Sequence, residues 1–93
     1  MIKSYRDKAT RKIAERLRSR RLPGDIQQRA MMRLERINAA EALDDLRVPP
    51  SHRLEVLRGD RTGQHSIRIN DQWRICFEWR DGHAYDVEIT DYH

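Results

Sequence analysis

The sequence predicts an α+β fold in which a short N-terminal strand and two helices precede an antiparallel β-meander, with the helices packed on one face of the sheet. Apolar residues recur at helical spacing in the first half of the chain and at every second position after residue 53. Turn-forming residues interrupt the second pattern at short intervals. A chain of 93 residues is long enough for one modest core, so residues 1–93 are expected to form one domain.

The N-terminal part is expected to contain one strand and one basic helix. Met1–Tyr5 is short and free of helical spacing, and it is expected to add a strand to the sheet. A helical pattern begins at Arg6, and Leu22-Pro23-Gly24 is expected to end it. Its narrow apolar stripe consists of Ala9, Ile13 and Leu17.

A second helix is expected to begin at Asp25, whose side chain would cap it with Gln28 completing a capping box. Its buried stripe is Ile26, Ala30, Leu34 and Ile37, with Met31 at the edge. Asn38–Ala40 is expected to end or bend this helix, and Glu41–Asp45 to form one more turn. The prolines of Arg47–Ser51 then make a stiff connection to the strands.

Three or four strands follow, because alternation with a period of two buries one face of a sheet and exposes the other. Turns are expected at Gly59–Gly63, Asn70–Gln72 and Asp81–His83. The inward-facing positions are Ile67, Ile69, Trp73, Ile75, Phe77, Trp79, Tyr85, Val87 and Ile89.

The apolar face also predicts the register of the last two strands. A tight turn at Asp81-Gly82 alone would place Phe77 opposite a charged residue. A shift of one residue pairs Phe77 with Val87 and Ile75 with Ile89. A three-residue loop or a bulge is therefore expected near this hairpin.

The same reasoning places Arg68 directly opposite Arg74 on the polar face, which is expected to be open to solvent. Like charges in that arrangement are destabilising, so an anion is expected between the two guanidinium groups. Tyr92 falls on the same face two positions beyond Thr90, with His93 at its edge.

Composition narrows the partners and the compartment. The net charge is +4, and 16 of the 19 basic residues are arginine, which grips phosphate oxygens with a planar fork. Residues 1–21 hold nine basic and two acidic residues, a net +7 that suits nucleic acid, an acidic partner or a membrane surface. Cys76 is the only cysteine, which excludes an internal disulfide and favours the cytoplasm. No apolar run is long enough for a signal peptide or a transmembrane span.

Three motifs together resemble the HigB branch of the RelE toxin superfamily. They are Leu57-Arg58-Gly59-Asp60-Arg61, then Asn70-Asp71-Gln72-Trp73-Arg74, and the ending Asp91-Tyr92-His93. The resemblance implies a RelE-like fold and a ribosome-dependent endoribonuclease that cuts messenger RNA without a metal or cofactor. It also implies a helix-turn-helix antitoxin similar to HigA and binding at the ribosomal A site. Operator DNA would be reached only through that antitoxin, and no membrane is involved.

The chemistry that the resemblance implies needs a proton-transfer group and fixed cations. Histidine has an unperturbed pKa of roughly 6.5, which suits general acid–base catalysis at neutral pH, so the resemblance implies His93 for this role. Arg74 would stabilise the charge of the transition state. Tyr92 would stack on a base or transfer a proton, and Asp91 would orient His93. Arg58 and Arg68 would contact phosphates. The candidate site residues are therefore His93, Arg74, Tyr92, Asp91, Arg58 and Arg68.

Each assignment has a purely structural alternative. His93 would be a frayed terminus, and Arg74 a surface partner of Glu78. Arg58 would be a solubilising charge beside a turn, and Asp91 would cap the end of a strand. The chain also departs from the family, because Arg58 replaces the lysines of many relatives and the histidine nearest to that strand, His52, lies in the connection. The second proton-transfer group is therefore open.

Two other classes of function compete with an endoribonuclease. A non-catalytic module that binds RNA or the ribosome would block translation by occupancy and would not need the terminal histidine. A DNA-binding regulator would use the basic first helix. The long amphipathic helix after Leu22-Pro23-Gly24 argues against a helix-turn-helix, whose second helix is short.

Overall fold

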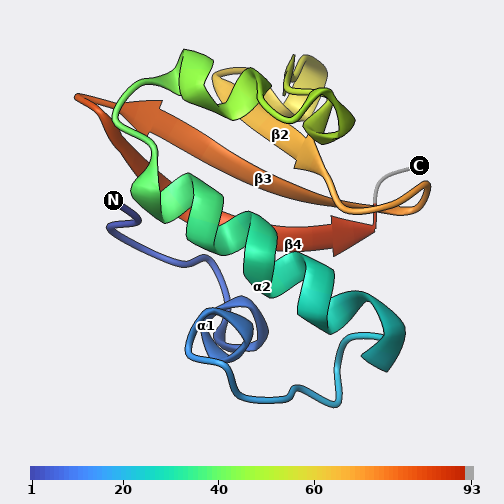
Figure 1. Ribbon diagram of the computed structural model, residues 1–93. Helices are drawn as coiled ribbons and strands as arrows, with labels where there is room; N and C mark the ends of the chain where they lie inside the picture. Colours follow the sequence, from blue (N-terminus) through green and yellow to red (C-terminus); the bar gives the residue numbers. More distant parts are fainter. Residues whose placement is uncertain (92–93) are drawn as a thin grey trace.

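One antiparallel sheet of four strands forms the centre of the protein, and two α-helices lie on one of its faces (Figure 1). A computed structural model describes residues 1–91. The strands run in chain order across the sheet and are β1 (Glu55–Val56), β2 (Gln64–Arg68), β3 (Trp73–Arg80) and β4 (His83–Asp91). The predicted α+β meander is confirmed.

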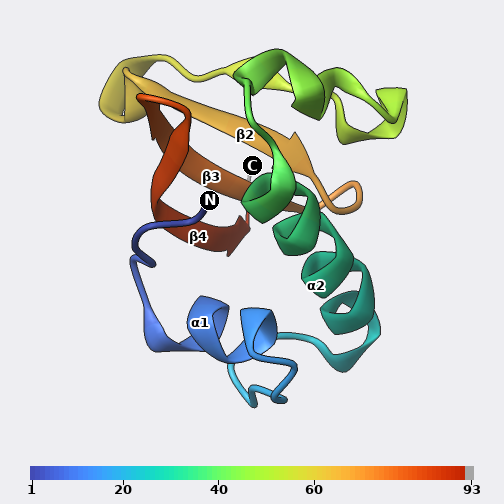
Figure 2. The same ribbon diagram turned by 60° about the vertical axis from the view of Figure 1, so that its left-hand side comes forward.

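The N-terminal segment lies along the outer edge of β4 (Figure 2). Ile2 and Tyr5 form isolated parallel bridges with Ala84 and Val87. The Lys3 amide donates to the Ala84 carbonyl at 2.8 Å. The expected N-terminal strand is thus present as two bridges to the sheet edge rather than as a continuous ladder.

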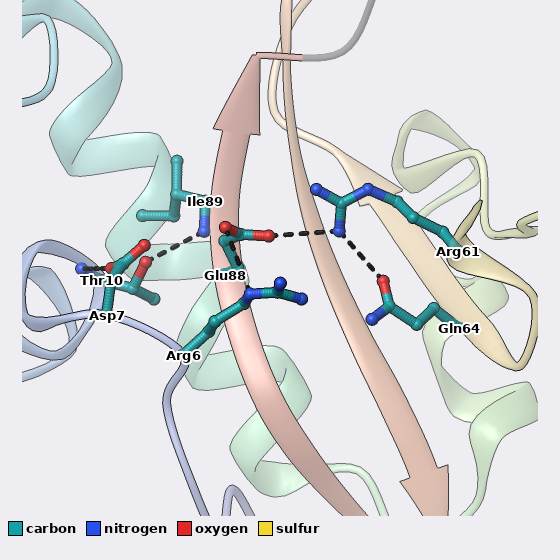
Figure 3. A network of polar contacts seen from close by, with 7 residues as sticks. All are labelled: Arg6, Asp7, Thr10, Arg61, Gln64, Glu88 and Ile89. Atoms are coloured by element: carbon teal, nitrogen blue, oxygen red, sulfur yellow. Dashed lines mark hydrogen bonds and ion pairs between the residues drawn. The ribbon is translucent and has the colours of Figure 1, made fainter.

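Helix α1 (Lys8–Ala14) begins where Asp7 accepts a hydrogen bond from the Thr10 amide at 2.7 Å. Thr10 is fully buried, and its hydroxyl accepts a hydrogen bond from the Ile89 amide at 2.9 Å. This bond attaches the first turn of α1 to β4, as Figure 3 shows.

Helix α1 ends eight residues earlier than the sequence pattern predicts. Arg16 has a φ of +65°, and the Leu17 amide donates to the Lys12 carbonyl at 2.8 Å while the Arg16 amide donates to the Ile13 carbonyl at 3.0 Å. This pair of bonds is a Schellman motif, which closes a helix when one residue turns left-handed. Leu17 is therefore 55% exposed, and its assignment to the apolar stripe is wrong.

Helix α2 (Gly24–Ala39) confirms the predicted buried stripe and the predicted end. Ile26, Ala30, Leu34 and Ile37 are all buried, and Ala40 caps the last turn. The predicted capping box is wrong, because Pro23 is the N-cap residue and no side chain caps the helix. Asp25 lies inside the first turn instead, where its negative charge interacts favourably with the positive end of the helix dipole.

Three 3-10 turns connect the helices to the strands. They are η1 (Leu43–Arg47), η2 (Pro50–His52) and η3 (Gly59–Arg61). The expected extra turn after α2 is present as η1, two residues later than predicted. His52 is fully buried, and its Nδ1 lies 3.1 Å from the Leu46 carbonyl.

The strand register follows the apolar face as predicted from Ile67 to Ile89, with one error. Tyr85, which was expected to face inward, pairs with Glu78, and Ala84 is buried in the core instead. Ile67 lies opposite Ile75, Ile75 lies opposite Ile89, and all three are buried against α2 in the core. On the other face Arg68 lies opposite Arg74, as the pattern predicts.

A three-residue loop or a bulge was expected near the hairpin of β3 and β4. The structure has a bulge, which shifts the register of the two strands by one residue. Arg80 pairs with His83, so the hairpin keeps a tight Asp81-Gly82 turn. The register then shifts between Cys76 and Glu78. Opposite this point Asp86 has a φ of +51°, the left-handed geometry that lets a strand accommodate one extra residue.

The helices cover the face that carries Ile67, Ile75 and Ile89, and the opposite face is left for polar side chains (Figure 1). The helices of residues 1–91 lack the length and hydrophobicity of a membrane span.

Candidate functional site

Two rows of polar side chains cross the sheet face that points away from the helices. Thr90 on β4 pairs with Arg74 on β3, and Arg74 pairs with Arg68 on β2. The next row along the strands contains Glu55, Ser66, Cys76 and Glu88. Because side chains alternate along a strand, both rows share one face.

Arg74 is held in place by oxygen atoms of two neighbouring segments. Its Nε donates to the Ser66 hydroxyl at 2.7 Å, and one terminal nitrogen donates to the Arg53 carbonyl at 2.8 Å. Ser66 is fully buried, so its hydroxyl is a fixed acceptor. A guanidinium oriented by fixed acceptors is ready to stabilise negative charge without rearranging.

The sequence pattern did not identify Ser66 or the Arg53 carbonyl as parts of this site. The signal for Ser66 was its position on the polar face two residues before Arg68, one row away from Arg74. Nothing in the sequence pointed to Arg53. Its φ of +45° lets the chain bend after η2 and bring the carbonyl onto the polar face.

Arg68 forms an ion pair with Asp71 in the turn between β2 and β3. An anion was expected between Arg68 and Arg74, and the protein provides one carboxylate for the first of these two arginines. Asp71 is almost fully exposed. A solvent-exposed ion pair contributes little to stability, so a phosphate could replace this carboxylate at small cost.

Arg68 and Arg74 line one side of an open pocket of about 370 Å³. Its lining residues are Arg53, Glu55, Arg68, Asn70, Asp71 and Arg74. Three arginines against two carboxylates leave a positive balance in this pocket. A phosphate group with its sugar fits such a polar concave surface.

Asp91 is the last residue that the structure describes, and it ends β4 opposite Trp73. Its carboxylate accepts a hydrogen bond from the Gln72 side chain at 2.9 Å. Asp91 follows Thr90, the partner of Arg74, so β4 ends one position beyond the arginine row. The candidates Tyr92 and His93 lie outside the described residues.

Arg58 and Arg61 lie at the two ends of the η3 turn and have different surroundings. Arg58 is the N-cap residue of η3 and is exposed, and it is not among the residues that line the Arg74 pocket. Arg61 is turned onto the sheet, 3.1 Å from the Glu88 carboxylate and 3.1 Å from the Gln64 side-chain oxygen.

The Glu88 network covers part of the polar face, which is therefore less open than expected. Arg6 approaches the second Glu88 oxygen at 3.9 Å from the N-terminal side, opposite Arg61 (Figure 3). Cys76 and Ser66 are buried beside this network. Side chains thus close the polar face around Glu88 and leave a pocket around Arg74.

Within residues 1–91, the remaining reactive groups do not form a second site. Burial raises the pKa of the Cys76 thiol, which disfavours the thiolate that a nucleophilic cysteine needs. Burial lowers the pKa of His65, whose ring lies 6.0 Å from that of Phe77 on the helix-covered face. No cluster of histidine, cysteine and carboxylate side chains within residues 1–91 has the composition of a metal site.

Comparison with known proteins assigns the chain to a family. Residues 3–93 match the family described as HigB-like toxin, RelE-like toxin of the type II toxin–antitoxin system HigB. The chain belongs to the HigB-like toxin family. The predicted resemblance is therefore confirmed over nearly the whole toxin.

Two relatives are similar to this toxin over most of their length. A protein named Endoribonuclease HigB from Proteus vulgaris is 33% identical over 93 residues and covers 100% of both chains. A protein named Toxin HigB-1 from Vibrio cholerae serotype O1 is 42% identical over 72 residues, which is 77% of this chain and 76% of the relative.

A solved structure confirms the RelE-like fold of the toxin. A chain of the YoeB–YefM complex from Staphylococcus aureus superposes with a TM-score of 0.62 and covers 100% of this chain and 98% of its own. The two sequences are only 16% identical, so this likeness concerns the fold alone.

Proposed function

We propose that this toxin is an endoribonuclease that cleaves messenger RNA on the translating ribosome, with the Arg74 pocket as its active site. The observation that supports this most is the fixed guanidinium of Arg74, oriented by Ser66 and the Arg53 carbonyl beside a second arginine. The name of the Proteus vulgaris relative, Endoribonuclease HigB, points to the same activity.

The proposed reaction needs no metal. The 2′-hydroxyl of the RNA loses its proton and attacks the adjacent phosphorus, and the bond from phosphorus to the 5′-oxygen breaks. That oxygen takes up a proton, and the other product carries a 2′,3′-cyclic phosphate. His93 is proposed as a general base or acid, because histidine is the residue type whose unperturbed charge change falls near neutral pH. Arg74 stabilises the charge on the phosphorane oxygens.

The other candidates hold the RNA or the histidine. Arg68 contacts a phosphate in the pocket, and the exposed Arg58 contacts the strand farther out. Tyr92 stacks on a base or takes part in proton transfer. Asp91, which ends β4 beside the arginine row, orients His93 through a hydrogen bond.

The ribosome is proposed to supply the alignment that the pocket lacks. In-line geometry between the 2′-hydroxyl and the leaving oxygen is worth about 7–11 kcal/mol. The Arg74 pocket is open and is formed by a sheet face and two loops. The ribosomal A site presents the message in an extended form, which would hold the strand across this face.

The proposed partner is a helix-turn-helix antitoxin of the HigA kind, and the proposed compartment is the cytoplasm. The solved structure with the same fold is a complex named YoeB–YefM. In this toxin the +7 charge of residues 1–21 offers a docking site for an acidic segment. Operator DNA would be contacted through the antitoxin. A pull-down that returned no small co-encoded protein would contradict this part of the proposal.

Mapping of RNA ends tests the activity. The toxin is induced in cells with a reporter message, and the 5′ ends are compared with those from cells that express the Arg74→Ala variant. New 5′ ends within the translated region that require Arg74 are expected. Arrest of translation without new ends would instead indicate a non-catalytic module that occupies the ribosome.

A further inference from the structure

Helix α2 carries a row of arginines along the edge that faces β2 and η2. Arg29, Arg33 and Arg36 follow one another at intervals of four and three residues, so they share one edge beside the buried stripe. Arg29 donates to the Ile69 carbonyl at 3.2 Å, and Arg33 donates to the Ser51 hydroxyl at 3.3 Å. We call these three residues the α2 arginine strip.

The strip is a concentration of like charge without matching carboxylates. Among the ion pairs of residues 1–91, none includes Arg29, Arg33 or Arg36. On the opposite edge of the same helix, by contrast, Glu35 pairs with Arg16 at 3.0 Å. An uncompensated row of positive charge costs stability and makes a surface that attracts anions.

Electrostatics connect the strip to the candidate active site. Burial lowers the pKa of Arg33, and the positive charges of Arg29, Arg36 and Arg68 lower it further. Arg68 is the arginine paired opposite Arg74 on the polar face. The positive electrostatic field of the strip therefore overlaps that of the Arg74 pocket near the end of β2.

A second cavity also links the α2 arginine strip to the Arg74 pocket. It has a volume of about 500 Å³ and lies between α2 and the turn after β2. Asn70 lines both this cavity and the Arg74 pocket. Met32, which is 56% exposed, adds an apolar surface next to the arginines. The remaining residues of its lining are Asp25, Ile26, Gln28, Arg29, Arg33 and Ile69.

We propose that the α2 arginine strip binds the backbone phosphates of the same RNA strand whose scissile phosphate lies at Arg74. This inference rests on the proposed function. The strip continues directly from the pocket past Asn70, which favours a continuation of the bound strand over a separate acidic protein. Arginine suits this role, because its fork grips phosphate oxygens and its flat face stacks on bases. Asp25, the carboxylate of the second cavity, precedes Arg29 at the N-terminal end of the strip.

The test compares two variants with equal changes in charge. One replaces the strip (Arg29→Gln, Arg33→Gln, Arg36→Gln). The control, which is compared for RNA binding alone, replaces three exposed arginines of the proposed antitoxin-docking segment (Arg18→Gln, Arg20→Gln, Arg21→Gln). The probe is an RNA of about twelve nucleotides, long enough for a strand-binding groove, with 2′-O-methyl groups that prevent cleavage. Its affinity is measured over a range of salt concentrations, starting at low ionic strength.

The strip variant is expected to bind about tenfold more weakly, and its slope of log K against log salt is expected to fall by about 2, or about 0.7 for each lost phosphate contact. The control is expected to keep the slope of the wild type. A triple Arg→Lys variant of the strip is expected to keep most of the slope. The single Arg36→Glu variant, at an exposed position, guards against loss of folding through Arg29 or Arg33.

Other outcomes separate the failure of this inference from the failure of the proposed function. Equal binding by the strip and control variants, with wild-type cleavage on ribosomes, would overturn the strip alone. A strip variant that binds the probe normally but fails to bind message-free ribosomes or the antitoxin would assign the surface to another partner and also overturn it. A wild type that neither binds RNA nor produces new RNA ends would overturn both proposals.

Discussion

Two halves of the same sheet face use arginine in different ways. Around Glu88, Arg61 and Arg6 approach one carboxylate from two sides, and the charges offset one another (Figure 3). Around Arg74, the guanidinium is held by a hydroxyl and a backbone carbonyl. The ion pairs of Glu88 attach the N-terminal segment and the η3 turn to the sheet, whereas Arg74 lines an open pocket. We therefore expect the first half to stabilise the fold and the second to contact RNA.

The largest effect is expected from removal of His93, which would sharpen this comparison by assigning proton transfer to the Arg74 half. The shortened protein is expected to lose about 10²–10⁴ in cleavage rate while it binds ribosomes nearly as well as the wild type, because general acid–base catalysis contributes about that much. Purified proteins are compared on translating ribosomes and on naked RNA, with binding measured separately.

Two results would count against this view. Undiminished cleavage by the shortened protein on ribosomes would remove His93 from the mechanism. Efficient wild-type cleavage of naked RNA would remove the requirement for the ribosome.

The second prediction sets the two halves against each other directly. Arg74→Ala is expected to fold and to cleave about 10²–10³ times more slowly, the usual cost of one fixed donor to a developing negative charge. The matched control, Arg61→Ala in the Glu88 half, is expected to lower the free energy of unfolding by about 1 kcal/mol and to leave the cleavage rate of the folded protein within a few fold. Equal rate losses in the two variants would break the comparison.

The third prediction concerns how Arg74 is oriented. Ser66→Ala removes the hydroxyl that accepts from the Arg74 Nε, and about a tenfold loss in kcat with little change in KM is expected. Ser66 is a positioning residue, so the same substitution in an Arg74→Ala background is expected to cause no further loss. Additive losses in that double variant would show that Ser66 acts only through the stability of the sheet.

The sequence predictions succeeded for features that the periodicity of the chain determines and failed for features that depend on single side chains. The pairing of Arg68 with Arg74 was predictable, because side chains alternate along a strand and the apolar face fixes the register. The position of Asp91 at the end of β4 followed from the same register. These features depend on the periodicity of the chain.

The errors and omissions concern single residues whose geometry depends on distant neighbours. The left-handed Arg16 ends α1 early, and no residue type at that position signals it. Behind it, the Gln27 side chain donates to the Ser19 carbonyl at 2.7 Å and helps to fix the connection to α2. Likewise, the partners of Arg61 and Arg74 depend on paths of long side chains across two strands. Side-chain periodicity contains no information on such paths.

The smallest expected effect is a pH dependence of stability that arises on the helix side of the sheet rather than on its polar face. His52 is fully buried, with Nε2 lacking a hydrogen-bond partner within residues 1–91. Burial lowers the pKa of His52, and the charges of Arg33 and Arg36 lower it further, whereas its bond to the Leu46 carbonyl acts in the opposite direction.

A histidine with a lowered pKa in the folded state binds a proton more readily when the chain is unfolded. Above about pH 6.5 both states are neutral at His52, and it adds no pH dependence. As the pH falls below that value the unfolded chain gains the proton first, so the free energy of unfolding decreases until the folded-state pKa of His52 is passed.

Urea denaturation at pH 7 and pH 5.5 is expected to show this loss. The loss should be smaller in His52→Gln and smaller again when His65, whose pKa burial also lowers, is replaced as well. An unchanged loss in the double variant would place the titrating groups elsewhere.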